Sequence, residues 1–248
     1  MSLKNNVVVI AGATGDVGSG ATRAFLNAGA TVLGISRSHA KLDALRAELG
    51  IGASDRFIGV EGDFRDDADA VRSRDAVREA LGDRAIDHVV SGVGFITFAQ
   101  AATVTPIGLV RQSLEDGLFN TIHVAQAFLP ELKKRPGSSY TMVSGGLAHG
   151  LPPFVPNVQN MWLAALKNGA VNALTHGLAA ESLQDEVRVN TLCIHFGVAR
   201  IGKNTNHFGM ATEKDTLALG AAFVGVAHGQ QRGEVICLGT WDDVTRLA

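Results

Sequence analysis

The chain has little cysteine, little excess charge and no long apolar run. Two cysteines in 248 residues, Cys193 and Cys237, have no paired-ligand spacing, which argues against a disulfide framework and against a zinc site. The eight histidines show no H-x-x-x-H spacing, so no metal site is expected. A formal net charge of −2 shows no excess of positive charge of the kind that binds nucleic acid or an anionic membrane. No apolar run reaches the roughly 18–20 residues of a membrane span.

The polar N-terminal residues enter a predicted strand at once, unlike a signal peptide. We therefore expect a cytoplasmic protein with no nucleic-acid or membrane partner. Apolar residues make up 46% of the chain, which is enough for a sizeable core. The length fits one domain of the larger α/β kind, spanning residues 1–248.

Strand-like and helix-like patterns alternate along the whole chain. Short apolar runs predict strands at Val7–Ile10, Thr31–Ile35, Arg56–Val60, Ile86–Ser91, Tyr140–Ser144, Val187–Ile194 and Glu234–Leu238. Helical spacing predicts helices at Gly18–Ala28, Ala40–Leu49, Asp67–Leu81, Ile107–Arg135 (one or two helices) and Met161–Leu183. This order predicts an α/β fold: a single-domain, Rossmann-like, doubly wound parallel sheet of about seven strands with helices on both faces. Ligands of such a sheet bind at the carboxyl ends of its strands.

A glycine-rich turn follows the first predicted strand. Gly12, Gly15 and Gly18 are spaced as G-x-x-G-x-x-G between the strand and a helix. In such a turn the first glycine permits a sharp bend, the second lets the backbone approach a pyrophosphate, and the third allows close helix packing. The free N–H groups and the helix dipole then favour an anion. We expect a dinucleotide site, although a plain tight turn has the same pattern.

Several segments, in order, resemble the short-chain dehydrogenase/reductase family over nearly the full length. They are the glycine turn, Gly62-Asp63-Phe64, Asp87–Gly94, Phe119-Asn120-Thr121, and Leu174–Glu181 followed by Arg188-Val189-Asn190. The resemblance implies a cofactor site made of Gly12, Thr14, Gly15, Asp16, Val17, Gly18, Ser36, Arg37, Asp63, Phe64, Ser91, Gly92, Gly94 and Asn168. It also implies a homodimer or homotetramer acting on a small-molecule substrate.

The end of the second predicted strand indicates the cofactor. An acid there would bind the ribose 2′-hydroxyl of NAD, whereas an arginine would pair with the 2′-phosphate of NADP. The sequence Gly34–Ser38 contains no acid and has Arg37 at the family's NADP position. NADP is therefore favoured and NAD remains possible, with a merely solvated Arg37 as the alternative. The carboxylate of Asp16 would repel a pyrophosphate unless it turns outward, where it can stabilise the helix dipole.

The family's catalytic tyrosine is missing. The chain has one tyrosine, Tyr140, and it lies within a predicted strand, ahead of Ser144, which matches the catalytic serine. Alignment without gaps puts Ala164 at the tyrosine position and Asn168 at the position of the following lysine. A slip of one residue gives Leu163 and Lys167 instead, which restores the lysine but not the tyrosine.

Other groups would then have to take over these roles. The resemblance assigns Asn120 to a proton relay and Ser144 to the substrate oxygen. His149 is a candidate replacement acid, because a histidine titrates near neutral pH, and His195 is a weaker candidate. Asn168 can bind the ribose in place of lysine, while Lys167 is expected to be a solvated helix residue.

Two functions remain open at this point. The first is an oxidoreductase of this type, acting on a small carbonyl or alcohol through an atypical active site. The second is a catalytically impaired dinucleotide-binding sensor or scaffold; non-redox lyase or isomerase chemistry is a more remote third. The substrate loop is expected at roughly residues 197–216, and its sequence does not identify the substrate.

Overall fold

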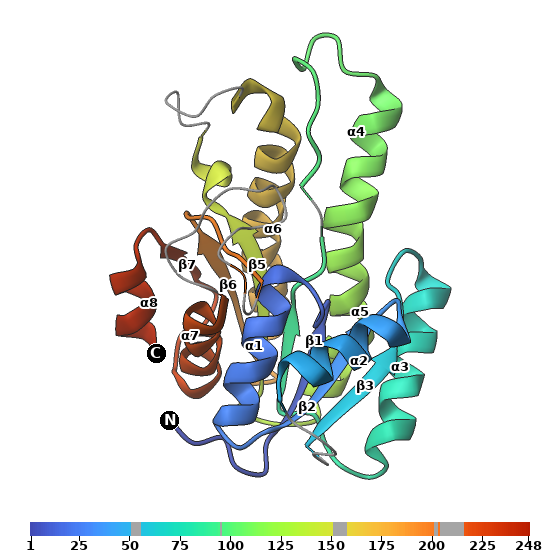
Figure 1. Cartoon of the computed structure of the whole chain (residues 1–248), viewed down its shortest axis with the longest axis vertical. Coiled ribbons are helices and arrows are strands. Elements are labelled where there is room, and N and C mark those ends of the chain that lie inside the picture. Colours follow the sequence, from blue (N-terminus) through green and yellow to red (C-terminus); the bar gives the residue numbers. More distant parts are fainter. Residues whose placement is uncertain (51–55, 95, 151–157, 201–202, 204–215) are drawn as a thin grey trace.

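A computed structural model describes the chain except residues 51–55, 95, 151–157, 201–202 and 204–215. One sheet of parallel strands forms its centre, in the order β3-β2-β1-β4-β5-β6-β7 (Figure 1). The strands are β1 (Val7–Ala11), β2 (Thr31–Ser36), β3 (Phe57–Glu61), β4 (His88–Ser91), β5 (Ser139–Gly145), β6 (Arg188–Ile194) and β7 (Val235–Leu238). This order confirms the Rossmann-like, doubly wound α/β fold that the sequence predicts.

Helices cover both faces of the sheet. They are α1 (Asp16–Asn27), α2 (His39–Glu48), α3 (Asp67–Leu81), α4 (Ile107–Leu114), α5 (Asn120–Leu132), α6 (Trp162–Glu181), α7 (Thr216–His228) and α8 (Trp241–Leu247). Three short turns complete the described elements: the π-helical η1 (Glu115–Phe119) and the 3₁₀ turns η2 (Gly146–His149) and η3 (Val158–Met161). The predicted segment Ile107–Arg135 is thus two helices, joined by η1.

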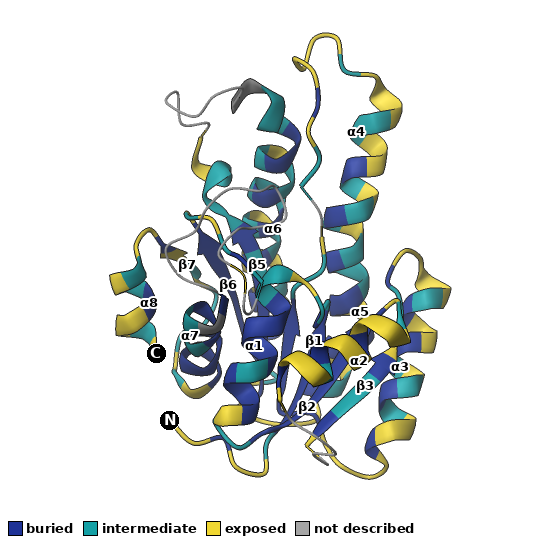
Figure 2. Ribbon diagram, in the orientation of Figure 1, coloured by how far each residue is buried: buried dark blue, intermediate teal, exposed yellow. Residues whose placement is uncertain are grey.

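The alternation of side chains along β1 divides the core into two parts. Val8 and Ile10 pack with residues of α1, α2, α7 and α8 on one face. Val7 and Val9 pack with residues of α3, α5 and α6 on the other. Because successive strand residues point to opposite faces, an uninterrupted apolar strand requires cover on both sides. Figure 2 shows the result, with buried strands between helices whose outer surfaces are exposed.

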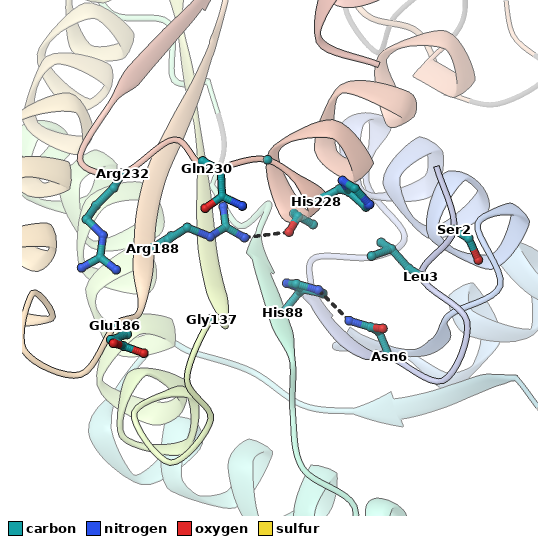
Figure 3. A pocket seen from close by; sticks show the side chains of 12 residues that line it. Ser2, Leu3, Asn6, His88, Gly137, Glu186, Arg188, His228, Gln230 and Arg232 are labelled. Atoms are coloured by element: carbon teal, nitrogen blue, oxygen red, sulfur yellow. Dashed lines mark hydrogen bonds between the residues drawn. The ribbon is translucent and has the colours of Figure 1, made fainter.

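An open cavity of about 530 Å³ lies at the amino-terminal edge of the sheet (Figure 3). It is lined in part by His88 and Arg188, the first residues of β4 and β6. The Arg188 guanidinium is already engaged, donating hydrogen bonds to the carbonyl oxygens of Val226 and Ala227 at 2.8 and 2.6 Å. The glycine turn follows the opposite end of β1, so this cavity is separate from the expected cofactor site. None of the described helices is long and apolar enough to span a membrane.

Candidate active site

The glycine turn is closed so tightly that two of its positions exclude a side chain. Gly12 has φ +79°, and a Cβ on it would lie 2.7 Å from the carbonyl oxygen of Gly92. A Cβ on Gly18 would lie 2.1 Å from the carbonyl oxygen of Gly12. Both contacts are with backbone, which cannot move aside as a flexible side chain can. The turn therefore packs directly against the segment that follows β4, at the start of α1.

The N-terminus of α1 is open towards this turn. Gly15 is its N-cap residue, and no side chain of the described residues caps it. The first N–H groups of a helix have no partner within the helix, so they are available to an anion. Asp16 and Val17 are the first residues of the helix. The Asp16 carboxylate therefore lies in the first turn, where a negative charge interacts favourably with the helix dipole.

Side chains from two other segments surround the turn. The hydroxyls of Thr14 and Ser36 share a hydrogen bond of 3.0 Å, joining the turn to the end of β2. Arg37 follows directly and is exposed. Arg200 donates to the carbonyl oxygen of Thr14 at 2.6 Å and forms an ion pair with Glu48 at 2.9 Å. Sequence reasoning missed Arg200, because an isolated arginine beyond a strand carries no signal of a contact 186 residues away.

Asp63 and Phe64 lie beyond β3 and have different roles. The Asp63 carboxylate accepts a hydrogen bond from the Phe64 N–H at 2.8 Å and forms an ion pair with Arg65. The Phe64 ring is buried and makes an edge contact with Phe128, at 6.2 Å between centroids. The ring of Phe64 is therefore part of the core, and the Phe64 carbonyl oxygen lies 2.7 Å from the His123 Nδ1 atom.

The single tyrosine is a core residue. Tyr140 is fully buried in β5, and its hydroxyl donates to the carbonyl oxygen of Thr121 at 3.3 Å. Burial raises the pKa of Tyr140 well above its ordinary value, since the phenolate would lose its hydration. Ala164, at the family's tyrosine position, is also buried. Neither residue can supply a proton to a substrate.

Ser144 lies at the end of β5, against α6. Its hydroxyl donates to the Oδ1 atom of Asn172 at 2.6 Å, and only 5% of the residue is exposed. Asn168 is buried beside it: a Cβ on Gly145 would lie 2.8 Å from the Asn168 Nδ2 atom. Ser144 and Asn168, both predicted from the sequence, therefore lie close together at the carboxyl end of β5.

Lys167 is not the solvated helix residue expected from the sequence. A Cβ on Gly117 would lie 2.1 Å from the Lys167 Cδ atom, and one on Gly94 would lie 3.4 Å from its Nζ atom. The side chain thus runs along η1, and its ammonium group lies near the segment after β4. Burial lowers the pKa of Lys167 to about 8. The expectation was wrong because Gly117 leaves room for the lysine stem.

Asn120 begins α5 directly after η1. Its Nδ2 atom donates to the carbonyl oxygen of Asp116 at 3.3 Å. Its Oδ1 atom is buried and accepts no hydrogen bond within the described part of the chain. A buried acceptor in this state fits a bound water, which is the partner that the relay role requires. Ser91 and Gly92 complete this region, where the Gly92 N–H donates to the carbonyl oxygen of Ala11 at 2.9 Å.

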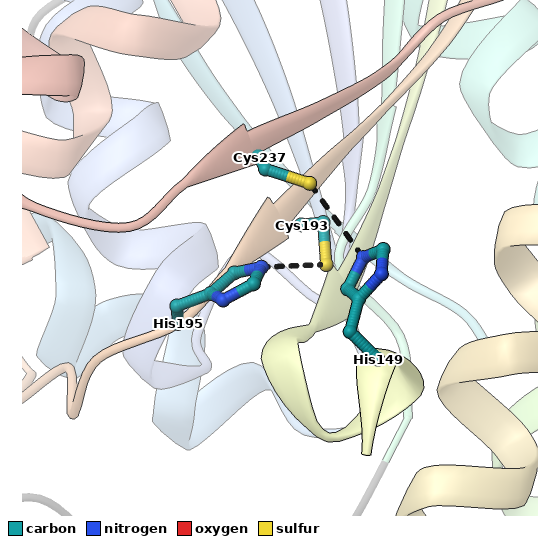
Figure 4. Close-up of side chains that lie close together, drawn as sticks. All are labelled: His149, Cys193, His195 and Cys237. Atoms are coloured by element: carbon teal, nitrogen blue, oxygen red, sulfur yellow. Dashed lines mark hydrogen bonds between the residues drawn. The ribbon is translucent and has the colours of Figure 1, made fainter.

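His149 belongs to a cluster with Cys193, His195 and Cys237 at the carboxyl ends of β6 and β7 (Figure 4). Its Nε2 atom is 3.6 Å from the sulfur of Cys237, and its ring stacks on that of His195 at 5.3 Å between centroids. The His195 Nε2 atom is 3.5 Å from the sulfur of Cys193. Most of the predicted substrate loop lies outside the described residues.

Comparison with known proteins gives consistent matches. The family model described as short chain dehydrogenase matches residues 6–207. L-fucose dehydrogenase of Mus musculus is 29% identical over 186 residues, which cover 75% of this chain and 63% of that protein. The chain therefore matches less than two thirds of the length of this relative.

Two solved structures share the fold. A short chain oxidoreductase from Pseudomonas aeruginosa PAO1, described as containing an atypical catalytic center, is 21% identical with a TM-score of 0.80, covering 96% of this chain and 98% of that one. The 3-ketoacyl-(acyl-carrier-protein) reductase from Brucella melitensis, complexed with NADH, is 19% identical with a TM-score of 0.78, covering 97% and 99%. At these identities the likeness concerns the fold alone.

Proposed function

Because the chain belongs to the short-chain dehydrogenase/reductase family, we propose that it is an NADP(H)-dependent oxidoreductase interconverting a small carbonyl compound and its alcohol. The observation that carries this proposal is the position of Lys167, which is half-buried, with its stem against Gly117 and its ammonium group near Gly94. Partial burial lowers the pKa of Lys167 to about 8, and an ammonium group with such a pKa is a proton source suited to near-neutral conditions. A protein that only binds a dinucleotide has no need of one.

The cofactor part of the proposal rests on the turn between β1 and α1. The steric closure at Gly12 and Gly18 and the open helix N-terminus fit a pyrophosphate, which needs close backbone approach and free N–H groups. Arg37 is exposed beyond β2, and no acid occupies the segment 34–38. Both features favour the 2′-phosphate of NADP over the free hydroxyl of NAD. Bound there, the nicotinamide cofactor would supply or accept the hydride.

The chain's own residues would handle the substrate oxygen and the proton. The Ser144 hydroxyl, which donates to Asn172 in the free protein, would turn and donate to that oxygen. The Lys167 ammonium would provide the proton that the family takes from tyrosine, with water held at Asn120 Oδ1 as its link to solvent. We prefer Lys167 to His149, since His149 lies towards β7 while Lys167 lies towards the β1–β4 crevice.

A dinucleotide-binding sensor is the second candidate. It is favoured by one observation, the buried Ala164 at the position of the family's tyrosine. The two functions share the cofactor site and differ only in turnover. Both therefore predict the same binding behaviour, and a test has to measure binding and turnover separately.

The first test is titration of the full chain with NADPH and NADH, followed by nicotinamide fluorescence. We expect NADPH to bind at least tenfold more tightly, and Arg37→Ala to remove that preference while leaving NADH binding unchanged. Arg232→Ala is the matched control, because Arg232 lines the cavity at the opposite edge of the sheet. Binding of neither cofactor would contradict both functions.

The second test is a carbonyl-reduction screen at saturating NADPH. Turnover that is lost in Lys167→Met, with NADPH still bound, supports the enzyme. Tight NADPH binding with no turnover over a broad set of aldehydes and ketones supports the sensor instead.

A further inference from the structure

We propose that His149, Cys193, His195 and Cys237 bind one Zn²⁺ ion at the carboxyl ends of β6 and β7. Each residue offers one ligand atom, and these four atoms all lie within 4.8 Å of one another (Figure 4). Two thiolates and two imidazoles form a donor set that is typical of tetrahedral zinc. This site takes no part in the proposed cofactor binding.

The distances between ligand atoms match those around a tetrahedral ion. Zinc bonds of about 2.3 Å to sulfur and about 2.0 Å to nitrogen place neighbouring ligand atoms about 3.5 Å apart. The Cys193–His195 and Cys237–His149 pairs are separated by 3.5 and 3.6 Å. The widest separation in the group, 4.8 Å, exceeds that spacing by little more than 1 Å.

The fold brings the four residues together by three independent routes. Cys193 and Cys237 are register partners in the parallel pair β6–β7, so their side chains leave the same face of the sheet. Cys193 and His195 are two residues apart at the end of β6, which also favours one face. His149 ends η2, the turn that follows β5. A metal here would join the segment after β5 to the edge strand β7.

The surroundings allow a metal to enter. Cys193 is buried, while His149, His195 and Cys237 are exposed, so the group is reached from solvent. Cys193 is also the register partner of Ser144, which places the metal beside the proposed oxygen-binding serine. The metal and the acid role considered for His149 exclude each other, because a ligating imidazole nitrogen carries no proton.

Two alternative arrangements of the same side chains predict different behaviour. In the first, the close pairs are weak thiol–imidazole hydrogen bonds, which hold no metal. In the second, Cys193 and Cys237 are linked by a disulfide in an oxidised sample. A test therefore needs reduced protein, without a polyhistidine tag, and a readout of the ligand atoms themselves.

The experiment is Co²⁺ and Zn²⁺ titration of the reduced, chelator-treated full chain, without dinucleotide. We expect one Co²⁺ per chain, with the strong visible bands of tetrahedral cobalt and a near-ultraviolet thiolate charge-transfer band. Added Zn²⁺ should abolish both signals and raise the Tm. Because no cofactor or substrate is present, the result is independent of NADPH binding, so either proposal can fail alone.

Variants identify the ligands. Cys237→Ser and His149→Ala should each weaken Zn²⁺ binding at least about tenfold, and Cys237→Ser should also weaken the charge-transfer band. His176→Ala is the matched control, since His176 is an exposed histidine of α6 outside the cluster, and it should bind as the parent does. Absence of a tetrahedral cobalt spectrum would overturn the proposal. So would a spectrum that Cys237→Ser leaves unchanged.

Discussion

The side chain of Lys167 occupies the space that a side chain at position 117 would need. A Cβ on Gly117 would lie 2.1 Å from Lys167 Cδ and 2.9 Å from its Cγ atom. The lysine stem therefore packs directly on the π-helical turn η1, and this contact carries its ammonium group towards Gly94. Because Gly117 of η1 has no side chain, Lys167 of α6 can extend across η1 towards Gly94.

Gly117→Ala should displace Lys167 and lower turnover. The added methyl overlaps the lysine stem, so either the stem or η1 has to move, at a cost of about 1–3 kcal/mol in the free energy of unfolding. We expect kcat for carbonyl reduction to fall at least tenfold, and urea denaturation to give the stability change. Gly108→Ala is the control, because a Cβ there meets nothing within 4 Å. Equal kcat in the two variants would contradict the role of this contact.

The pKa of Lys167 predicts opposite pH profiles for the two reaction directions. Burial lowers this pKa from 10.5 to about 8, so the ammonium form, the proton donor, predominates below that pH. At saturating substrate, kcat for reduction should fall as the pH rises through about 8. Alcohol oxidation needs the neutral amine as proton acceptor, so its kcat should rise over the same range.

Variants of Lys167 test the assignment of this inflection. Lys167→Met should lower kcat by roughly 10²–10⁴-fold. Lys167→Arg should keep the positive charge but remove the inflection near pH 8, because a guanidinium stays protonated. Lys134→Met is the control, at an exposed lysine paired with Glu131, and it should change neither kcat nor the inflection near pH 8. An inflection that persists in Lys167→Arg would assign it to another group.

Tyr140→Phe should leave turnover unchanged. Substitution of the family's catalytic tyrosine, which Tyr140 does not match, would instead be expected to inactivate the enzyme. The Tyr140 hydroxyl is buried and donates to the Thr121 carbonyl oxygen, so its loss removes one internal hydrogen bond. We expect a loss of about 1 kcal/mol in the free energy of unfolding, measured by urea denaturation. A large loss of kcat with a normal NADPH affinity would refute the structural role given to Tyr140.

The fold was predictable because its signals are local. Seven apolar runs separated by helical patterns indicate a parallel sheet, and the spacing of Gly12, Gly15 and Gly18 indicates a tight turn before a helix. The observed limits of single elements differ from the predicted ones by a residue or two. The first strand, predicted to end at Ile10, extends to Ala11 in β1. The predicted strand at Ile86 begins two residues later, at His88.

The active site was less predictable because it depends on which way single side chains point. One residue along a helix rotates the side chain by about 100°, so a shift from Asn168 to Lys167 changes the group that enters the crevice. The packing partner that decides between them, Gly117, is 50 residues away in the sequence. The separation of His149, Cys193 and Cys237 likewise gives no motif, because parallel strands bring together residues that are far apart in the chain.

His88 predicts a loss of stability in mild acid. It is buried at the start of β4, with one ring nitrogen 2.9 Å from the Ser139 hydroxyl and the other 3.0 Å from Asn6 Nδ2. Burial lowers the pKa of His88 from 6.5 to about 4, and the charges of Arg188 and Arg135 act in the same direction. Between these pH values the unfolded chain binds a proton that the folded chain does not. The contribution of His88 to the free energy of unfolding is therefore fully present above about pH 6.5, and it is lost as the pH is lowered towards 4.

The size of this effect follows from the pKa difference. At about 1.4 kcal/mol per pKa unit, His88 accounts for about 3 kcal/mol lost between pH 6.5 and pH 4. Urea denaturation of the parent and of His88→Gln at intervals over this range measures it. The variant is expected to be less stable at pH 7, so the decisive quantity is the slope with pH, which should become shallower. His176→Ala should keep the parental slope, and a parental slope in His88→Gln would assign the acid sensitivity to other groups.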